Sequence, residues 1–102
     1  MKKTRLDLQY LLEDILGNTN VYFQPPDNVH LQYPAIVYSR EKIATRHADN
    51  IPYAAFNRYK ITVISKTPLH PAVDKLALLP MCVHVSNFIS DNLYHDVFQL
   101  YF

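Results

Sequence analysis

The sequence predicts one α+β domain over residues 1–102, with two helices packed on one face of a mostly antiparallel sheet of about five strands. Its length, 102 residues, is typical of a single domain. Two segments place apolar residues at helical spacing, and about five others are rich in β-branched and aromatic residues. The resulting order is helix, three strands, helix, two strands.

The first helix is predicted over residues 4–16. Thr4 and Asp7 have the spacing of a capping box, and Gly17, the only glycine, stands where a helix end favours a left-handed residue. The apolar face consists of Leu8, Leu11, Leu12, Ile15 and Leu16. The opposite face, with Arg5, Gln9, Glu13 and Asp14, is interpreted as solvated surface.

The first two strands are predicted at Val21–Phe23 and Pro34–Tyr38. Pro25 and Pro26 end the first strand, because they lack the N–H that a sheet requires. Residues 39–53 are predicted to be a long loop, since charged side chains crowd the segment and Asp-Asn-Ile-Pro is a turn signal. Long loops in compact domains are usually functional or become ordered by a partner.

The remaining elements are a central strand, a short helix and a hairpin. The strand over residues 54–65 places Tyr59, Ile61 and Val63 on one face and Lys60, Thr62 and Ile64 on the other. The helix runs from Ala72 to Leu79 after Pro71, with Val73, Leu76, Ala77 and Leu79 inward. A strand at residues 81–89 follows, then a three-residue turn at residues 90–92.

Residues 93–102 are predicted to form the final strand, an inner member of the hairpin with one face in the core. The other face is expected to meet a helix or a neighbouring subunit through some of Tyr94, Phe98 and Tyr101.

Composition argues against several classes of protein. Ten basic and nine acidic residues give a formal charge of +1, unlike the strongly basic surface of most nucleic-acid binders. No apolar run approaches the length of a membrane span, and acidic residues interrupt any signal-peptide core after Lys2 and Lys3. Cys82 is the only cysteine, which fits a reducing compartment, and it is interpreted as a small buried hydrophobe.

No pattern of residues predicts catalysis, a metal or a cofactor. None of the five histidines has the short spacing of two ligands on one helix, although His84 and His95 could face each other across the hairpin. One glycine cannot build a phosphate loop. A basic and aromatic mixture could stack nucleic-acid bases, but a strand beside a solvated loop explains it better: Arg46, Tyr53, Phe56, Arg58, Tyr59 and Lys60.

Five stretches carry a resemblance to known proteins: residues 21–26, 31–38, 48–53, 59–64 and 91–102. They resemble a family of small bacteriophage proteins from the head–tail region of tailed phages and prophages, and the resemblance covers residues 20–102. The chain is similar to the tail-terminator or tail-completion (tail-to-head joining) group. The resemblance implies a virion structural protein without catalytic residues, which forms a ring, usually a hexamer, on the end of the tail tube.

The resemblance also implies partners and a location. The partners are further copies of the chain, the tail tube protein and a head-completion or connector protein, with assembly in the host bacterial cytoplasm and no membrane. The tyrosine-rich strands and the 39–53 loop suit a contact surface. Expected contact residues are Arg40, Glu41, Lys42, Arg46, Asp49, Tyr53, Arg58, Tyr94 and Tyr101. A second charged surface is expected around Arg5 and Glu13.

Three alternatives remain open. The chain could be another neck or head-completion protein, a small nucleic-acid-binding accessory protein of a phage, or an enzyme with a histidine-based site.

Overall fold

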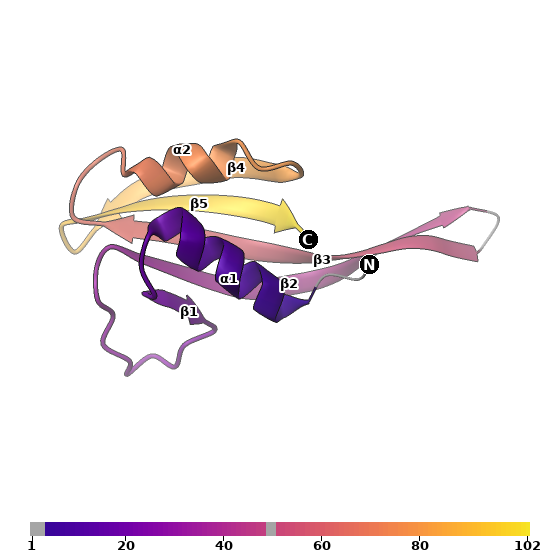
Figure 1. Ribbon diagram of the computed structural model, residues 1–102, viewed down its shortest axis with the longest axis horizontal. Helices are drawn as coiled ribbons and strands as arrows, with labels where there is room; N and C mark the ends of the chain where they lie inside the picture. Colours follow the sequence, from indigo (N-terminus) through magenta and orange to yellow (C-terminus); the bar gives the residue numbers. More distant parts are fainter. Residues whose placement is uncertain (1–3, 49–50) are drawn as a thin grey trace.

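The structure is a computed structural model that describes the backbone of residues 4–48 and 51–102 and the side chains of residues 4–41 and 58–102 (Figure 1). The described elements are α1 (Arg5–Leu16), β1 (Val21–Phe23), β2 (Ala35–Ala48), β3 (Ile51–Ser65), α2 (Pro71–Ala77), β4 (Cys82–Ser90) and β5 (Leu93–Tyr101). This order and the α+β class confirm the sequence prediction.

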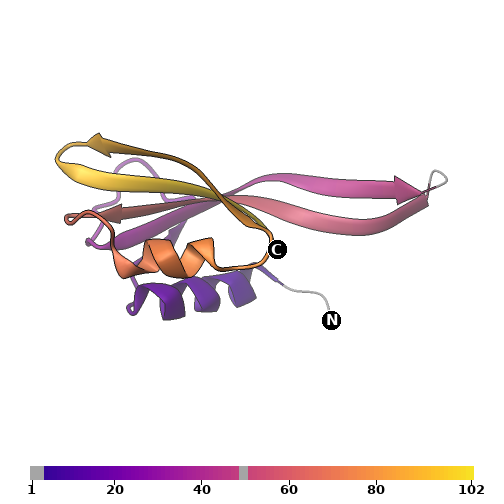
Figure 2. The ribbon, with the colours of Figure 1, turned by 90° about the horizontal axis from the view of Figure 1, so that it is seen from above.

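The five strands form one sheet in the order β1-β2-β3-β5-β4. β1 pairs with β2 in parallel, and the other neighbours are antiparallel. β5 is therefore an inner strand, as predicted, and β4 lies at an edge. Both helices lie on the same side of the sheet, where Figure 2 shows them next to each other.

The core lies between the helices and this covered face of the sheet. It contains buried apolar side chains from α1, α2, β1, β2, β3 and β5, and the partly buried Cys82 of β4 packs against them. The fully buried side chains include Leu8, Leu12, Ile36, Ile61, Leu76 and Phe98. In α2 the buried residues are Ala72 and Leu76, whereas Ala77 is exposed, so the prediction that Ala77 points inward was wrong. The helix ends earlier than predicted, and Ala77 lies in its last turn, away from the sheet.

The two ends of α1 have the caps that the sequence predicts. The Thr4 hydroxyl accepts a hydrogen bond from the Asp7 N–H, and the Asp7 carboxylate accepts one from the Thr4 N–H. Gly17 ends the helix with φ of 85°, a left-handed conformation that strains residues with a Cβ atom.

The β4–β5 turn is tighter than predicted. Ser90 pairs with Leu93, which leaves only Asp91 and Asn92 in the loop, and their φ angles are 53° and 62°. Two successive positive φ angles match a two-residue hairpin turn, which Asp and Asn tolerate.

The prediction of a loop over residues 39–53 was wrong. β2 continues to Ala48 and β3 begins at Ile51, and the two strands pair along their length. β1 pairs with β2 only at residues 36–38, and β5 pairs with β3 only at residues 58–65. We call residues 42–48 and 51–57 the β-arm. It extends beyond the rest of the sheet in Figures 1 and 2, and the chain measures 50 × 23 × 23 Å.

Candidate interaction surface

Three of the expected contact residues meet at the base of the β-arm. Glu41 on β2, Arg58 on β3 and Tyr101 on β5 lie on the face of the sheet opposite the helices, which we call the open face. Arg58 Nε lies 2.9 Å from Glu41 Oε2, although the Nε–H is not aligned for a hydrogen bond to that oxygen. A hydrogen bond with Tyr101, followed by attraction to Glu41, raises the pKa of the Arg58 guanidinium.

The other expected contact residues are dispersed. Arg40 is exposed, and its backbone N–H donates to Gln24 Oε1. Lys42, Arg46 and Tyr53 lie on the β-arm strands, where only the backbone is described, and Asp49 lies outside the described residues.

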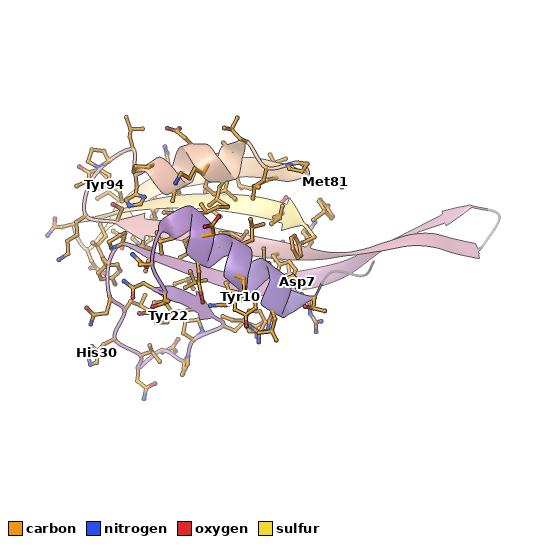
Figure 3. The ribbon with its side chains drawn as sticks, viewed as in Figure 1. Asp7, Tyr10, Tyr22, His30, Met81 and Tyr94 are labelled. Carbon is orange, nitrogen blue, oxygen red and sulfur yellow. The ribbon has the colours of Figure 1, made fainter. Side chains whose placement is uncertain are left out.

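Tyr94, half-buried on β5, lies far along the sheet from Tyr101, near the β4–β5 turn (Figure 3). The strand register shows that Tyr94 and Phe98 share the covered face and that Tyr101 is on the open face. Phe98 is fully buried in the core. The grouping of these three residues on one outward face was therefore wrong, because alternation along a strand separates Tyr101 from the other two.

The charged surface expected around Arg5 and Glu13 is largely an internal connection. Arg5 Nη1 donates to the Tyr38 hydroxyl at 3.1 Å, and this hydroxyl donates to Gln9 Oε1 at 2.5 Å. Gln9 Nε2 donates to Glu13 and to the Val21 carbonyl. Arg5 and Gln9 thus attach α1 to β1 and β2. The interpretation of this helix face as solvated surface was wrong for these two residues, whereas Asp14 is exposed.

β4 is an apolar edge strand that sequence analysis did not identify as a contact surface. Eight of its nine residues are exposed, including Val83, Val85, Phe88 and Ile89 at 61, 51, 50 and 66%. No charged residue occurs between Leu76 and Ser90, which is unusual for an edge because Lys, Glu or Pro commonly block further strand pairing there. An apolar strand without charges was the signal available in the sequence.

A bulge changes which residues of β4 share a face. Val83 pairs with Gln99 and Phe88 pairs with His95, so both lie on the open face although they are five residues apart. The register shift between His84 and Ser86 causes this.

Phe88 also stacks on His95, with ring centroids 4.6 Å apart. Shallow hollows surround this stack. One of about 450 Å³ includes Leu69, Ile89 and Tyr94, and one of about 370 Å³ lies between Val37 and Ile64 on the sheet and the loop around Val29. Such apolar hollows can accept side chains of a partner.

The histidines and the cysteine do not form a reaction centre in the described residues. His84 contacts Asp96 at 3.1 Å, while His95 lies on the other face, so the two histidines do not meet across the hairpin. No group of three or more metal-ligating side chains occurs in the described part of the chain. Burial raises the pKa of the Cys82 thiol, which reduces its thiolate fraction at neutral pH.

Comparisons with known proteins give no match: no family model, no curated protein and no solved structure matches the chain. Among the described helices, none combines the length and apolar character needed to cross a membrane.

Proposed function

We propose that this chain is a structural protein of a tailed bacteriophage or prophage virion that joins tail to head in the manner of tail terminators. It forms a ring, which we expect to have six copies, on the tail tube and presents a docking surface to a head-completion or connector protein. Another position in the neck is the nearest alternative. The resemblance in the sequence motivates this proposal, and the β-arm is the observation that carries it.

The β-arm supports assembly because it is incomplete in a single chain. Its two strands pair with each other, and no other described strand pairs with residues 42–48 or 51–57. An isolated two-stranded hairpin is marginally stable in water and gains stability from a third strand or a packing layer. A neighbouring protein can supply that layer, as in other structural subunits that reach across an interface.

The cluster at the arm's base supports the same proposal. Glu41, Arg58 and Tyr101 connect β2, β3 and β5 where the β-arm leaves the sheet. We expect this arrangement to restrict the arm's direction relative to the body. A defined direction is useful for a subunit that must meet its neighbours at one angle, because it reduces the ordering required at assembly.

The experiment is complementation of a phage from which the gene has been removed. We expect the wild-type chain to restore joined particles and to be found in purified virions at the head–tail junction by immunogold microscopy and mass spectrometry. Arg58→Met should reduce joining, whereas Lys66→Met, at an exposed position just after β3, should not. Absence of the chain from purified virions would refute the proposal.

A nucleic-acid-binding accessory protein is the second candidate, and the charge of the arm region favours it. Residues 40–60 contain five basic and two acidic residues, and a two-stranded ribbon can enter the DNA major groove. This candidate predicts DNA binding that weakens steeply with salt. Absence of binding to duplex or single-stranded DNA at low salt in fluorescence anisotropy would eliminate it.

A further inference from the structure

We propose that the β-arm of one copy docks along the β4 edge of the next copy and extends its sheet beside residues 86–90. This inference rests on the proposed self-assembly and specifies the two surfaces that meet. It makes the contact head-to-tail, with one surface of each copy against a different surface of its neighbour.

The first argument is that both surfaces have unused pairing capacity. β4 pairs with β5 on one side, and no described strand pairs with its other side. Beyond the bulge, residues 86–90 pair regularly with β5, so their outer edge offers an undistorted stretch of five residues. Strand addition to such an edge is a common mode of recognition.

The second argument is reach. Seven residues in each strand of the β-arm span about 23 Å at ~3.3 Å per residue. Five residues of β4 span about 17 Å on the same basis. The β-arm is therefore long enough to cover the regular part of the edge.

The third argument is charge complementarity. The β-arm contains two basic residues, Lys42 and Arg46, and no acidic residue. From Leu76 to Phe102 the chain has no Lys or Arg, and its two charged residues, Asp91 and Asp96, are acidic and lie in the β4–β5 hairpin. Attraction between the basic β-arm and Asp91, at the turn next to the β4 edge, favours this pairing, and repulsion disfavours contact between two β-arms.

The outer edges of the β-arm, with which no described strand pairs, argue against a two-fold contact between two β4 edges. Antiparallel pairing of β4 with its own copy would leave both β-arms without a third strand. Head-to-tail contact uses both surfaces of each copy and closes into a ring when the rotation between copies permits.

Disulfide cross-linking of the full-length chain tests the inference. In a Cys82→Ser background, one cysteine is placed on the β-arm (Ala44→Cys or Thr45→Cys) and one on the β4 edge (Ser86→Cys or Asn87→Cys). Adjacent positions on a strand face opposite sides, so the four combinations cover both faces. We expect at least one combination to give a ladder of covalent oligomers on oxidation, because each copy contributes both halves of the contact.

Single-cysteine variants and one matched pair are the controls. Each single variant should remain monomeric on a non-reducing gel, as should Thr45→Cys combined with Asp14→Cys, an exposed position on α1. Dimers from a single cysteine on β4 would overturn the inference in favour of two-fold contact.

Two other outcomes also overturn the inference and separate it from the proposed function. If light scattering shows oligomers but no arm–edge combination cross-links, the proposed contact between the β-arm and β4 is wrong, whereas the proposed ring is not contradicted. If the chain remains monomeric at millimolar concentration, direct self-docking is wrong, and virion composition decides the function independently.

Discussion

Replacement of Tyr38 by Phe tests how α1 is attached to the sheet. The Tyr38 side chain is buried, with 1% of its surface exposed, and its ring packs against Phe23 and Tyr59. Its hydroxyl accepts a hydrogen bond from Arg5 and donates one to Gln9. Phe keeps the ring contacts and removes both hydrogen bonds, so the change isolates the polar connection.

The expected cost follows from these two hydrogen bonds. A neutral hydrogen bond contributes about 1 kcal/mol to stability, and one to a charged group about 1.5–3 kcal/mol. Arg5 and Gln9 are partly exposed, so water can replace part of what they lose. We therefore expect a loss of about 1.5 kcal/mol in the free energy of unfolding, or about 6–12 °C in Tm for a domain of this size.

Denaturant unfolding followed by circular dichroism measures this loss. Tyr10→Phe is the matched control because Tyr10 also lies on α1 but is 64% exposed, and it should change stability by less than about 0.5 kcal/mol. Equal losses of stability for the two substitutions, or no loss for Tyr38→Phe, would show that the Tyr38 hydroxyl does not stabilise the attachment of α1 to the sheet.

The same residue predicts a loss of stability in alkali. Burial raises the pKa of Tyr38 above its usual value of 10.0. The folded state therefore holds this proton more tightly than the unfolded state, and the contribution is complete below pH about 10 and declines as pH rises through the folded pKa. Tyr38→Phe should lose less stability than the wild type between pH 9 and 11. A parallel decline in both proteins would assign the effect to other tyrosines.

Three further predictions concern separate parts of the chain. Thr4→Ala should lower the free energy of unfolding by about 1 kcal/mol, and Thr4→Ser should lower it much less, because serine can still cap α1. Equal losses for the two variants in denaturant unfolding would contradict a capping role. Phe98→Ala should lower the free energy of unfolding by about 3–5 kcal/mol, since the Phe98 ring is fully buried. Phe88→Ala should lower it far less in the monomer, because Phe88 is half-exposed. A larger loss for Phe88→Ala than for Phe98→Ala would contradict the assignment of Phe98 to the core. Cys82 should react with a thiol reagent at pH 7 more slowly in the folded protein than in urea-unfolded protein, because burial raises the pKa of its thiol. Equal rates in the two states would argue against that burial.

Local rules explain why much of the fold could be predicted from the sequence. Thr4, Asp7 and Gly17 define the ends of α1 through contacts within a few residues, and the alternation of Tyr59, Ile61 and Val63 assigns the faces of β3. These signals depend little on distant parts of the chain, so the element order and the α+β class followed from them.

The β-arm could not be predicted in this way. Its charged residues resemble a solvated loop, and the long-range register between β2 and β3 determines that Arg46 pairs with Ala54 and Lys42 with Arg58. Strand pairing of this kind depends on residues distant in the sequence, so it has no local periodic signature.

The candidate surface was predicted only in part, because its arrangement also depends on the strand register. Glu41, Arg58 and Tyr101 were expected as contacts from their residue types, but only the register brings them together. The β4 edge was missed because the sequence predicted a strand at residues 81–89 without its place in the sheet, which only the strand order supplies. The β-bulge between His84 and Ser86 also shifts the alternation of side chains between the two faces of β4. Regular alternation would place Val83 and Phe88 on opposite faces, whereas both lie on the open face.

The strand structure of the β-arm changes the expected energetics of assembly. A disordered loop of this length would lose conformational entropy at about 1–2 kcal/mol per residue when it docks. Residues 42–48 and 51–57 are already paired in the single chain, so docking orders side chains more than backbone. Assembly should therefore proceed with little change in far-ultraviolet circular dichroism. A large gain of β signal on oligomerisation would instead mean that the arm forms only on its neighbour.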